Sequence, residues 1–298
     1  MEIIAKSLTK IYDGKYKALD TVDLDINLNG IFSIIGKNGA GKTTLIRILS
    51  TQLMPTSGTA ILNGHDILRE AGKVREEIAA VPQEARAVPW LTPIQTVTSY
   101  LMWRGYTFSK AKQMGLDALR SMGLENLENQ KNRKLSGGQK RKLMVATVIA
   151  SEASIIFLDE PTTGLDYISR KELWEILRKL KKDRLIILTT HYLEEAEVLG
   201  DLITILDKGK IMDSGTIGDL RSKIKYPFVL KVYSPQFDIE MKYGRISRVS
   251  DNEFFIYGSE SEIYSLVQDM INRKVRFTVE EVSLSNIFEN LVGGGEED

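Results

Sequence analysis

The stretch IFSIIGKNGAGKTT, residues 31–44, determines the fold class of this chain of 298 residues. Its first five residues are nearly all apolar, which is typical of a short strand buried on both faces of a sheet. Residues 36–43 match G-x-x-x-x-G-K-[ST], a glycine-rich loop whose backbone N–H groups surround a phosphate. A helix is expected from about Thr43, with the positive end of its dipole directed at the same phosphate. Strand, loop and helix in this order predict an α/β core that binds a nucleoside triphosphate.

Nearly every residue of this loop has an expected role in binding the nucleotide. We expect the Lys42 ammonium to reach the β- and γ-phosphate oxygens and the Thr43 hydroxyl to ligate Mg²⁺. The other predicted contacts to the nucleotide are Gly36, Lys37, Asn38, Gly39, Ala40, Gly41 and Thr44. The alternative is a glycine-rich turn that ends in Lys-Thr by coincidence, and the strand before and the helix after the loop argue against it.

A second apolar strand, residues 155–158, ends in the two carboxylates Asp159 and Glu160. Ligands of open α/β sheets bind at the carboxyl ends of the strands. We therefore expect Asp159 to hold Mg²⁺, directly or through water, and Glu160 to orient or deprotonate an attacking water. A carboxylate pair that only caps a helix is the alternative, which the presence of a phosphate loop disfavours. With two histidines and no cysteine in the chain, a zinc site is not expected.

The segment LSGGQ, residues 135–139, predicts a second helix start that can bind an anion. Ser136 can cap the helix that follows, and Gly137 and Gly138 permit close approach to the backbone. The chain has one phosphate loop with a lysine, and a helix start can serve only the phosphates that it faces. Taken by itself, the segment is equally compatible with a glycine-rich cap of an ordinary helix.

The composition excludes several classes of protein. Lys and Arg together number 40, and Asp and Glu also number 40, so the formal net charge is zero. The chain as a whole therefore has no positive electrostatic field to attract nucleic acid or anionic lipid. The absence of cysteine excludes a disulfide scaffold and fits a reducing compartment. The N-terminus carries no signal-peptide pattern, and no apolar run approaches the roughly 20 residues of a membrane-spanning helix. These features predict a chain that is soluble by itself.

Turn residues and apolar patterning indicate how the first part of the chain is organised. Residues 1–30 predict β-hairpins with turns at 13–14 and 29–30, and residues 56–83 predict further strands. The pattern is helical over residues 89–150. Strands and helices then alternate, which predicts a parallel α/β sheet.

The last part of the chain predicts a separate small domain. Short strands and one helix over residues 225–292 indicate an α+β appendage. The tail GGGEED, residues 293–298, has nothing to pack and is expected to be disordered.

Taken together, these motifs resemble those of the nucleotide-binding subunit of ATP-binding cassette (ABC) transporters, and the similarity covers about residues 1–220. The resemblance implies a P-loop NTPase (RecA-like) core with an N-terminal antiparallel β subdomain and a helical subdomain at about 89–150. It implies an ATP-binding domain over residues 1–222, with ATP and Mg²⁺ as ligands, followed by the appendage.

The resemblance also implies roles for individual residues outside the phosphate loop. Tyr12 corresponds to the aromatic residue that stacks on adenine, and Gln83 to the glutamine that reaches Mg²⁺ and couples to the membrane partner. His191 corresponds to the histidine that senses the γ-phosphate and acts with Glu160 and Lys42 in catalysis. In this family the LSGGQ segment of one subunit covers the ATP of the other, and an aspartate crosses the interface. The residues implied for this role are Leu135, Ser136, Gly137, Gly138, Gln139 and Asp166.

A cluster of cations around the LSGGQ segment is expected to attract the nucleotide held by the partner. Its members are Lys131, Arg133, Lys134, Lys140, Arg141 and Lys142.

The resemblance implies an ATP-hydrolysing subunit that forms a homo- or heterodimer with another ABC subunit. Integral membrane permease subunits are its implied partners, with residues 89–105 as the face that receives them, and no nucleic acid is expected. It would lie in the cytoplasm, peripherally on the inner face of the cell membrane. The C-terminal run 282–289 is similar to the ending of exporter-type cassettes. A soluble ABC-type ATPase in nucleic-acid or ribosome-related work is the alternative, as is a nucleotide-binding regulator without activity.

Overall fold

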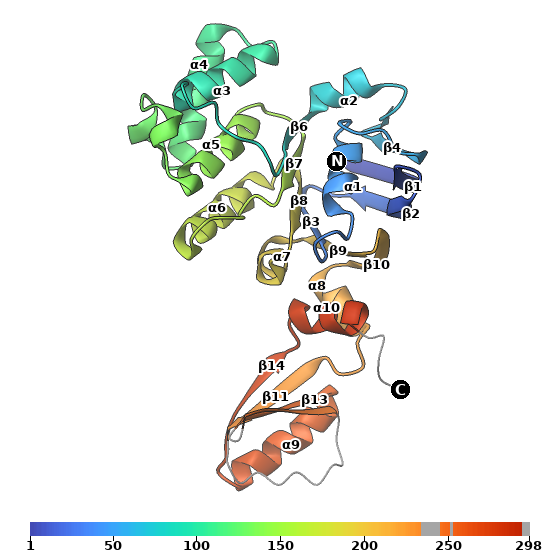
Figure 1. Cartoon of the computed structure of the whole chain (residues 1–298). Coiled ribbons are helices and arrows are strands. Elements are labelled where there is room, and N and C mark those ends of the chain that lie inside the picture. The colour runs from blue at the N-terminus through green and yellow to red at the C-terminus, as the bar shows by residue number, and fades with distance from the viewer. Residues whose placement is uncertain (234–244, 251–252, 294–298) are drawn as a thin grey trace. The chain divides into compact units, whose positions relative to one another are not determined.

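The computed structural model describes residues 1–233, 245–250 and 253–293 (Figure 1). The chain divides into two compact units, Met1–Ser214 and Gly215–Asp298. Each unit has hydrophobic core clusters of its own.

A six-stranded sheet forms the centre of the first unit. In spatial order its strands are β10 (Lys210–Gly215), β9 (Leu202–Asp207), β3 (Gly30–Ile35), β8 (Leu185–Thr190), β7 (Ile155–Asp159) and β6 (Ile78–Val81). β3 pairs in parallel with β8 and β9, and β7 pairs in parallel with β6 and β8. The predicted parallel α/β core is therefore confirmed. The carboxyl ends of β3, β6, β7 and β8 meet at one edge, where the site is expected.

Helices and a second sheet cover the two faces of this central sheet. The helices of the first unit are α1 (Lys42–Leu49), α2 (Ala71–Glu77), α3 (Pro93–Trp103), α4 (Phe108–Ser121), α5 (Gly137–Ile149), α6 (Tyr167–Leu180) and α7 (Leu193–Leu199). Because side chains alternate along a strand, neighbouring residues of β7 enter different cores. Phe157 packs with α1 and the second sheet, whereas Ile156 packs with α5, α6 and α7. The phosphate loop and the LSGGQ segment thus begin helices on opposite faces of one sheet.

The second sheet of this unit is the predicted N-terminal antiparallel one. Its strands, in spatial order, are β2 (Tyr16–Asn27), β1 (Glu2–Tyr12), β4 (Ser57–Leu62) and β5 (His65–Asp66). The turn at 13–14 closes the β1–β2 hairpin as predicted, but residues 29–30 lead from β2 into β3 of the other sheet. The further strands predicted over 56–83 are present as β4, β5 and β6, but α2 also lies within that range and was not predicted. Val74 is the one buried residue of α2, so its sequence carries little helical periodicity.

Three helices and two short 3₁₀ turns make up the helical region predicted for 89–150. Thr92 caps α3 and forms a capping box with Gln95. The 3₁₀ turns are Glu125–Leu127 and Asn132–Lys134. Asn132 is fully buried, and its side-chain amide donates to the backbone oxygen of Val88 and to the Thr96 hydroxyl, at 2.9 Å each. These bonds hold the loop before α3 against the loop before α5.

The second unit is the predicted α+β appendage. Its elements are α8 (Ile217–Ser222), β11 (Phe228–Tyr233), β12 (Arg245–Ser250), β13 (Glu253–Gly258), α9 (Glu260–Asn272), β14 (Arg276–Glu281) and α10 (Leu284–Gly293). The strands form an antiparallel sheet in the order β12-β13-β11-β14. Leu230, Ile256 and Met270 form its core with other residues of α9. Of the expected disordered tail, residues 294–298 lie outside the described residues.

The structure divides the chain earlier than the boundary expected between residues 222 and 225. Helix α8 belongs to the second unit because Arg221 binds the end of β14. Its Nε donates to the backbone oxygen of Val282 at 2.9 Å, and its guanidinium pairs with the Glu281 carboxylate.

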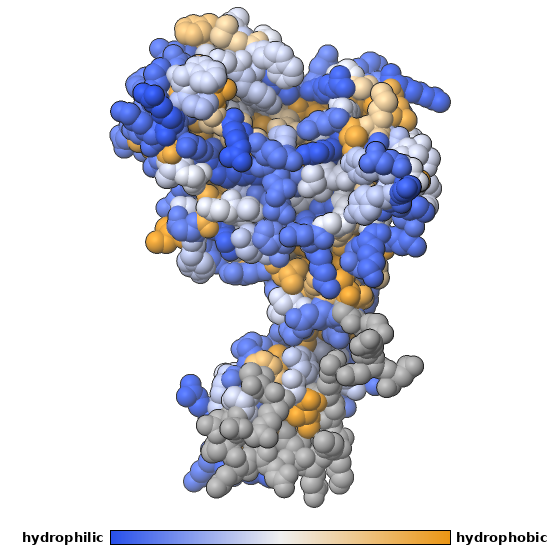
Figure 2. Space-filling model, viewed as in Figure 1, coloured by the Kyte–Doolittle hydropathy of each residue, from blue (hydrophilic) through white to orange (hydrophobic). Residues whose placement is uncertain are grey.

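The surface of the first unit is mostly hydrophilic in the view of Figure 2, with hydrophobic residues in separate patches. No helix within the described residues is long and apolar enough to cross a membrane.

Candidate active site

The phosphate loop runs from the carboxyl end of β3 to the first residue of α1, and two of its glycines are sterically required. A Cβ atom on Gly36 would lie 2.3 Å from the backbone oxygen of Leu206. Gly41 has a φ of +107°, and a Cβ there would lie 2.4 Å from the oxygen of Ala18. Gly41 is the N-cap of α1, so the N–H groups of the first helical turn have no partner in the helix and can bind an anion.

Lys42 lies buried inside this loop, with 5% of its surface exposed. Its ammonium donates to the backbone oxygens of Gly36 at 2.8 Å and Lys37 at 3.1 Å. Burial lowers the pKa of Lys42, and the carboxylates of Glu160 and Asp159 oppose that shift. The loop therefore holds a lysine between its own carbonyls and the two carboxylates at the end of β7.

Asp159 is buried and faces the start of α1. Its Oδ1 accepts hydrogen bonds from the hydroxyls of Thr43 at 3.2 Å and Thr189 at 2.5 Å. Its Oδ2 is buried and has no hydrogen-bond partner among the described residues. A buried carboxylate oxygen is rarely left unpaired, and Mg²⁺ prefers oxygen ligands. The unpaired oxygen beside the Thr43 hydroxyl therefore fits a magnesium ion.

Glu160 follows in a strained backbone conformation, with a φ of +49°. Such left-handed residues other than glycine cost about 1–3 kcal/mol and cluster at functional sites. The Glu160 carboxylate accepts from the Thr163 hydroxyl at 3.0 Å and the Gln83 amide at 3.2 Å, and it lies 3.3 Å from His191 Nδ1. Its backbone N–H donates to the Thr189 hydroxyl at 3.0 Å. The structure thus brings together Gln83, Glu160 and His191, which are far apart in the sequence.

A cavity of about 470 Å³ contains most of the residues expected at the nucleotide. It is lined by Tyr16, Ala18, Asn38, Gly39, Gly41, Lys42, Thr43, Thr44, Gln83, Glu160, Thr163 and His191. Tyr12, expected to stack on adenine, does not line it. Tyr16, its partner across the hairpin turn, does, and the Tyr16 hydroxyl donates to the Gly39 oxygen at 3.1 Å. Stacking by Tyr12 therefore stays a prediction, and Tyr16 is a cavity residue that the sequence reasoning missed.

The residues expected to act on a partner's nucleotide are absent from the lining of this cavity. Ser136 is exposed, caps α5 and forms a capping box with Gln139. Asp166 is exposed and caps α6, and hydrogen bonds from Ser169 lower the pKa of its carboxyl group. A Cβ on Gly137 would meet nothing within 4 Å, so no contact within the described part of the chain requires glycine there.

Arg141 corrects the prediction of a cationic cluster around the LSGGQ segment. Its guanidinium is turned inward and donates to five backbone oxygens at the carboxyl edge of the sheet. These are Asp159 at 2.5 Å, Glu160 at 2.9 Å, Pro161 at 3.1 Å, Pro82 at 3.3 Å and Gln83 at 3.4 Å. Burial lowers the pKa of Arg141, and Asp159 and Glu160 oppose that shift. The next cation, Lys142, pairs with Glu172 at 2.5 Å, so these two cations bind their own chain.

We predict that Arg141→Gln destabilises the chain more than the same change at Lys134, an exposed cation of the same cluster. The free energy of unfolding of Arg141→Gln should fall by about 1.5–3 kcal/mol or more, because one hydrogen bond to a charged group contributes that much. Urea unfolding of Arg141→Gln, Arg141→Lys and Lys134→Gln measures it. Arg141→Lys should recover only part of the loss, because an ammonium cannot match the guanidinium fork. Equal stability of the two glutamine variants would contradict the assignment.

Known proteins are similar to this chain over most of its length. The family model described as ABC transporter matches residues 19–163. The daunorubicin/doxorubicin resistance ATP-binding protein DrrA of Streptomyces peucetius is 37% identical over 223 residues, which cover 74% of this chain and 67% of that protein. The human retinal-specific phospholipid-transporting ATPase ABCA4 is 37% identical over 216 residues, 72% of this chain and 10% of that protein.

A third relative and a solved structure extend the comparison. ABC transporter A family member 7 of Dictyostelium discoideum is 34% identical over 303 aligned residues. The match covers 96% of this chain and 36% of that longer protein. The dimeric, post-hydrolysis structure of the ATP-binding cassette MJ0796 bound to ADP and Pi aligns with a TM-score of 0.67. That alignment is 27% identical and covers 72% of this chain and 98% of that one. The chain belongs to the ABC transporter family, and its first unit is an ATP-binding and ATP-hydrolysing cassette.

Proposed function

We propose that this chain powers an exporter. In this proposal it dimerises with another ABC cassette around two ATP molecules and drives transport through separate membrane permease subunits from the cytoplasmic face. The observation that carries it is the cavity in which Lys42, Gln83, Glu160 and His191 meet, while Ser136 is exposed outside it. Relatives named as a drug-resistance ATP-binding protein and as phospholipid-transporting ATPases support export. They favour a transporter over a soluble ATPase that works on nucleic acid or ribosomes.

Thr43, Gln83 and Asp159 are the residues that would hold Mg²⁺. The Thr43 hydroxyl and the unpaired Asp159 oxygen lie at the start of α1, where the phosphates are expected. A bound magnesium ion would neutralise part of the charge of the phosphate oxygens.

The side chains around Glu160 suit the activation of a water molecule. In the proposed reaction Lys42 binds the phosphate oxygens, and Glu160 accepts a proton from the attacking water. His191, 3.3 Å from Glu160, orients the carboxylate and contacts the γ-phosphate. The hydrogen bonds from Gln83 and Thr163 fix one oxygen of Glu160 and leave the other beside His191.

We predict that Glu160→Gln abolishes most turnover and leaves ATP bound in a stable dimer. The amide keeps the shape of the side chain but cannot accept the proton, and general-base catalysis contributes about 10²–10⁴-fold. Steady-state ATPase assays, together with size-exclusion chromatography in Mg-ATP, measure both effects. Glu175→Gln, at an exposed position on α6, makes the same change away from the cavity and should behave as wild type. Near-normal ATPase in Glu160→Gln would refute the role of base.

The exposed LSGGQ segment supports a site shared between two chains. The capping box of α5 uses the N–H groups of Ser136 and Gln139, which leaves those of Gly137 and Gly138 without a partner in the helix. None of these residues lines the cavity of its own chain. Gly137 leaves open space above the backbone, which a phosphate of another chain could enter. A related cassette has been solved as a dimer bound to ADP and Pi.

Mixing two inactive variants tests this arrangement. A Lys42→Ala subunit lacks a working phosphate loop, and a Ser136→Ala subunit lacks a working LSGGQ segment. We expect their mixture to recover ATPase activity, because each mixed dimer contains one intact composite site. A mixture of Lys42→Ala with the double variant Lys42→Ala/Ser136→Ala is the control and should stay inactive. No recovery in the first mixture would show that each site is complete within one chain.

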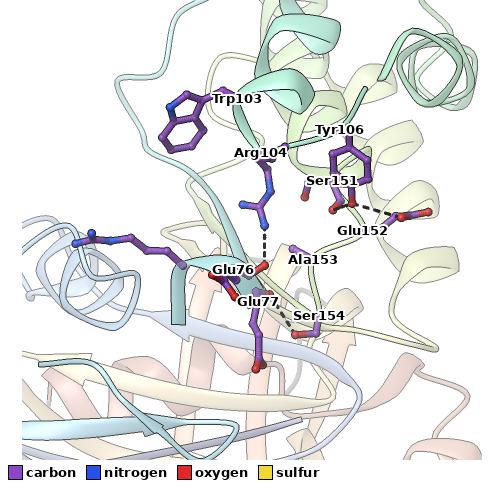
Figure 3. A pocket seen from close by; sticks show the side chains of 11 residues that line it. Glu76, Glu77, Trp103, Arg104, Tyr106, Ser151, Glu152, Ala153 and Ser154 are labelled. Carbon is purple, nitrogen blue, oxygen red and sulfur yellow. Dashed lines mark hydrogen bonds between the residues drawn. The ribbon is translucent and has the colours of Figure 1, made fainter. Parts of the chain in front are cut away.

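A surface at the end of α3 supports contact with a permease. Three large apolar residues are exposed there: Met102, Trp103 and Phe108. Trp103 lines a groove of about 570 Å³, together with residues 75–77, 104–106 and 151–154 (Figure 3). Exposed apolar clusters next to a groove are typical of protein interfaces, and an amphipathic helix of the partner could occupy this one.

The groove connects to the active site through β6. Arg104 donates to the backbone oxygens of Glu76 at 2.8 Å and Ile78 at 2.7 Å, which precede and begin that strand. Figure 3 shows the Arg104 side chain pointing toward Glu76, with the Trp103 ring turned away from it. Gln83 follows the other end of β6 and donates to Glu160. A partner seated on the groove would therefore contact the strand that carries Gln83.

We predict that Trp103→Ala weakens binding to the permease and leaves the basal ATPase rate unchanged. Trp103 is 82% exposed, so its removal costs little folding energy, whereas truncation of an interface tryptophan commonly costs more than about 2 kcal/mol of binding. Co-purification with the membrane subunits that the wild-type chain captures measures the effect. Tyr264→Ala, which removes an exposed aromatic ring from α9, should bind as wild type. Equal recovery of permease by both variants would contradict this assignment.

A further inference from the structure

Glu195 is a fully buried carboxylate on α7 that the reaction described above does not use. Its Oε1 accepts a hydrogen bond from Trp174 Nε1 at 2.8 Å, and its Oε2 accepts one from the Thr162 hydroxyl at 3.0 Å. A buried carboxylate is costly unless hydrogen bonds compensate it, and here each of its two oxygens accepts one.

The two hydrogen-bond partners of Glu195 lie beside residues with catalytic and cross-subunit roles. Thr162 follows Glu160 by two residues, and Trp174 lies on α6, which begins next to Asp166. Glu195 itself lies on α7, four residues after His191. One carboxylate thus ties the loop after β7 and α6 to the helix that follows His191.

A second set of contacts holds the same segments from the side. The Arg170 guanidinium of α6 lies over the Tyr192 ring at 4.0 Å, and the Tyr192 ring packs on His191 with 4.1 Å between ring centres. The Tyr192 N–H donates to the Thr190 hydroxyl at 2.9 Å. The position of His191 relative to Glu160 therefore depends on how α6 and α7 are held against the end of β7.

We propose that Glu195 is a positioning residue for ATP hydrolysis, which fixes the position of His191 relative to Glu160 through its bonds to Thr162 and Trp174. Glutamine in place of Glu195 has nearly the same shape, but its amide has one accepting oxygen instead of two. Its NH₂ group would face a neighbour that donates, so one of the two hydrogen bonds would be lost. Burial raises the pKa of Glu195, and the hydrogen bonds from Trp174 and Thr162 oppose the shift. The Trp174 indole can only donate, so the oxygen facing it must accept.

The test measures hydrolysis by the isolated subunit, so the proposal rests on ATPase activity and not on transport. We expect Glu195→Gln to lower kcat at least about 10-fold, because misplacement of reacting groups by about 1 Å can cost 10²-fold. The KM for ATP should stay within about twofold, since the hydrogen bonds of Glu195 go to Thr162 and Trp174 and the phosphate loop is left unchanged. Glu194→Gln is the matched control, an exposed neighbour on α7 that pairs with Lys171, and it should retain wild-type kinetics.

Thr162→Val provides a second variant that removes the same bond from the other side with little change in volume. Both single variants should lower kcat, and Glu195→Gln/Thr162→Val should be no slower than the slower single variant, because they break one link. Effects that multiply in the double variant, or a wild-type kcat in Glu195→Gln, would overturn the proposal.

Tryptophan fluorescence separates repositioning from general loss of structure. Trp174 is 2% exposed, whereas the other two tryptophans, Trp90 and Trp103, are 71% and 82% exposed. In a Trp90→Phe/Trp103→Phe background the emission therefore reports the Trp174–Glu195 bond. Glu195→Gln should shift this emission while the melting temperature stays within a few degrees of the parent. An unchanged emission, or a fall in kcat that only follows a lower melting temperature, would count against the proposal.

Discussion

The guanidinium of Arg141 is the constraint on which the geometry of the active site depends. It binds five backbone oxygens that belong to the ends of β6 and β7 and to the loops that follow them. These carbonyls have left the regular ladder of the sheet and need donors from elsewhere. A planar cation with five N–H groups satisfies them together, which a lysine could not do. Because Arg141 lies on α5, it also joins the helix that carries the LSGGQ segment to the catalytic carboxylate.

The same chain segment is also held by buried hydroxyl and carboxylate groups. Thr189 accepts from the backbone of Glu160 and donates to Asp159, and Glu195 binds Thr162. Glu160 keeps a left-handed backbone between these contacts and those of Arg141. A strained conformation persists only where its surroundings determine it, and the segment 159–162 is bound by β8, α5 and α7. The strain, the polar network and the catalytic carboxylate are therefore parts of one structural unit.

Patterns with a local cause were predictable from the sequence, and contacts between distant segments were not. The strand, loop and helix around Lys42 follow from apolar periodicity and glycine spacing, and the parallel sheet follows from alternating strands and helices. Arg141 could not be told from the neighbouring cations, because its role depends on carbonyls that other strands bring to it. The helix α2 was missed since it buries one residue, and Tyr16 was missed because its place at the cavity depends on the pairing of β2 with β1.

By itself the sequence determined the family, the α/β class and the residue types that would meet a nucleotide, because these motifs are contiguous and each has a local physical requirement. Only the tertiary structure decided which groups share a hydrogen-bond network. Gln83, Glu160 and His191 come together because three parallel strands end at one edge of a sheet. The buried partners of Glu195 and the inward turn of Arg141 depend on packing across that sheet, which no spacing along the chain encodes.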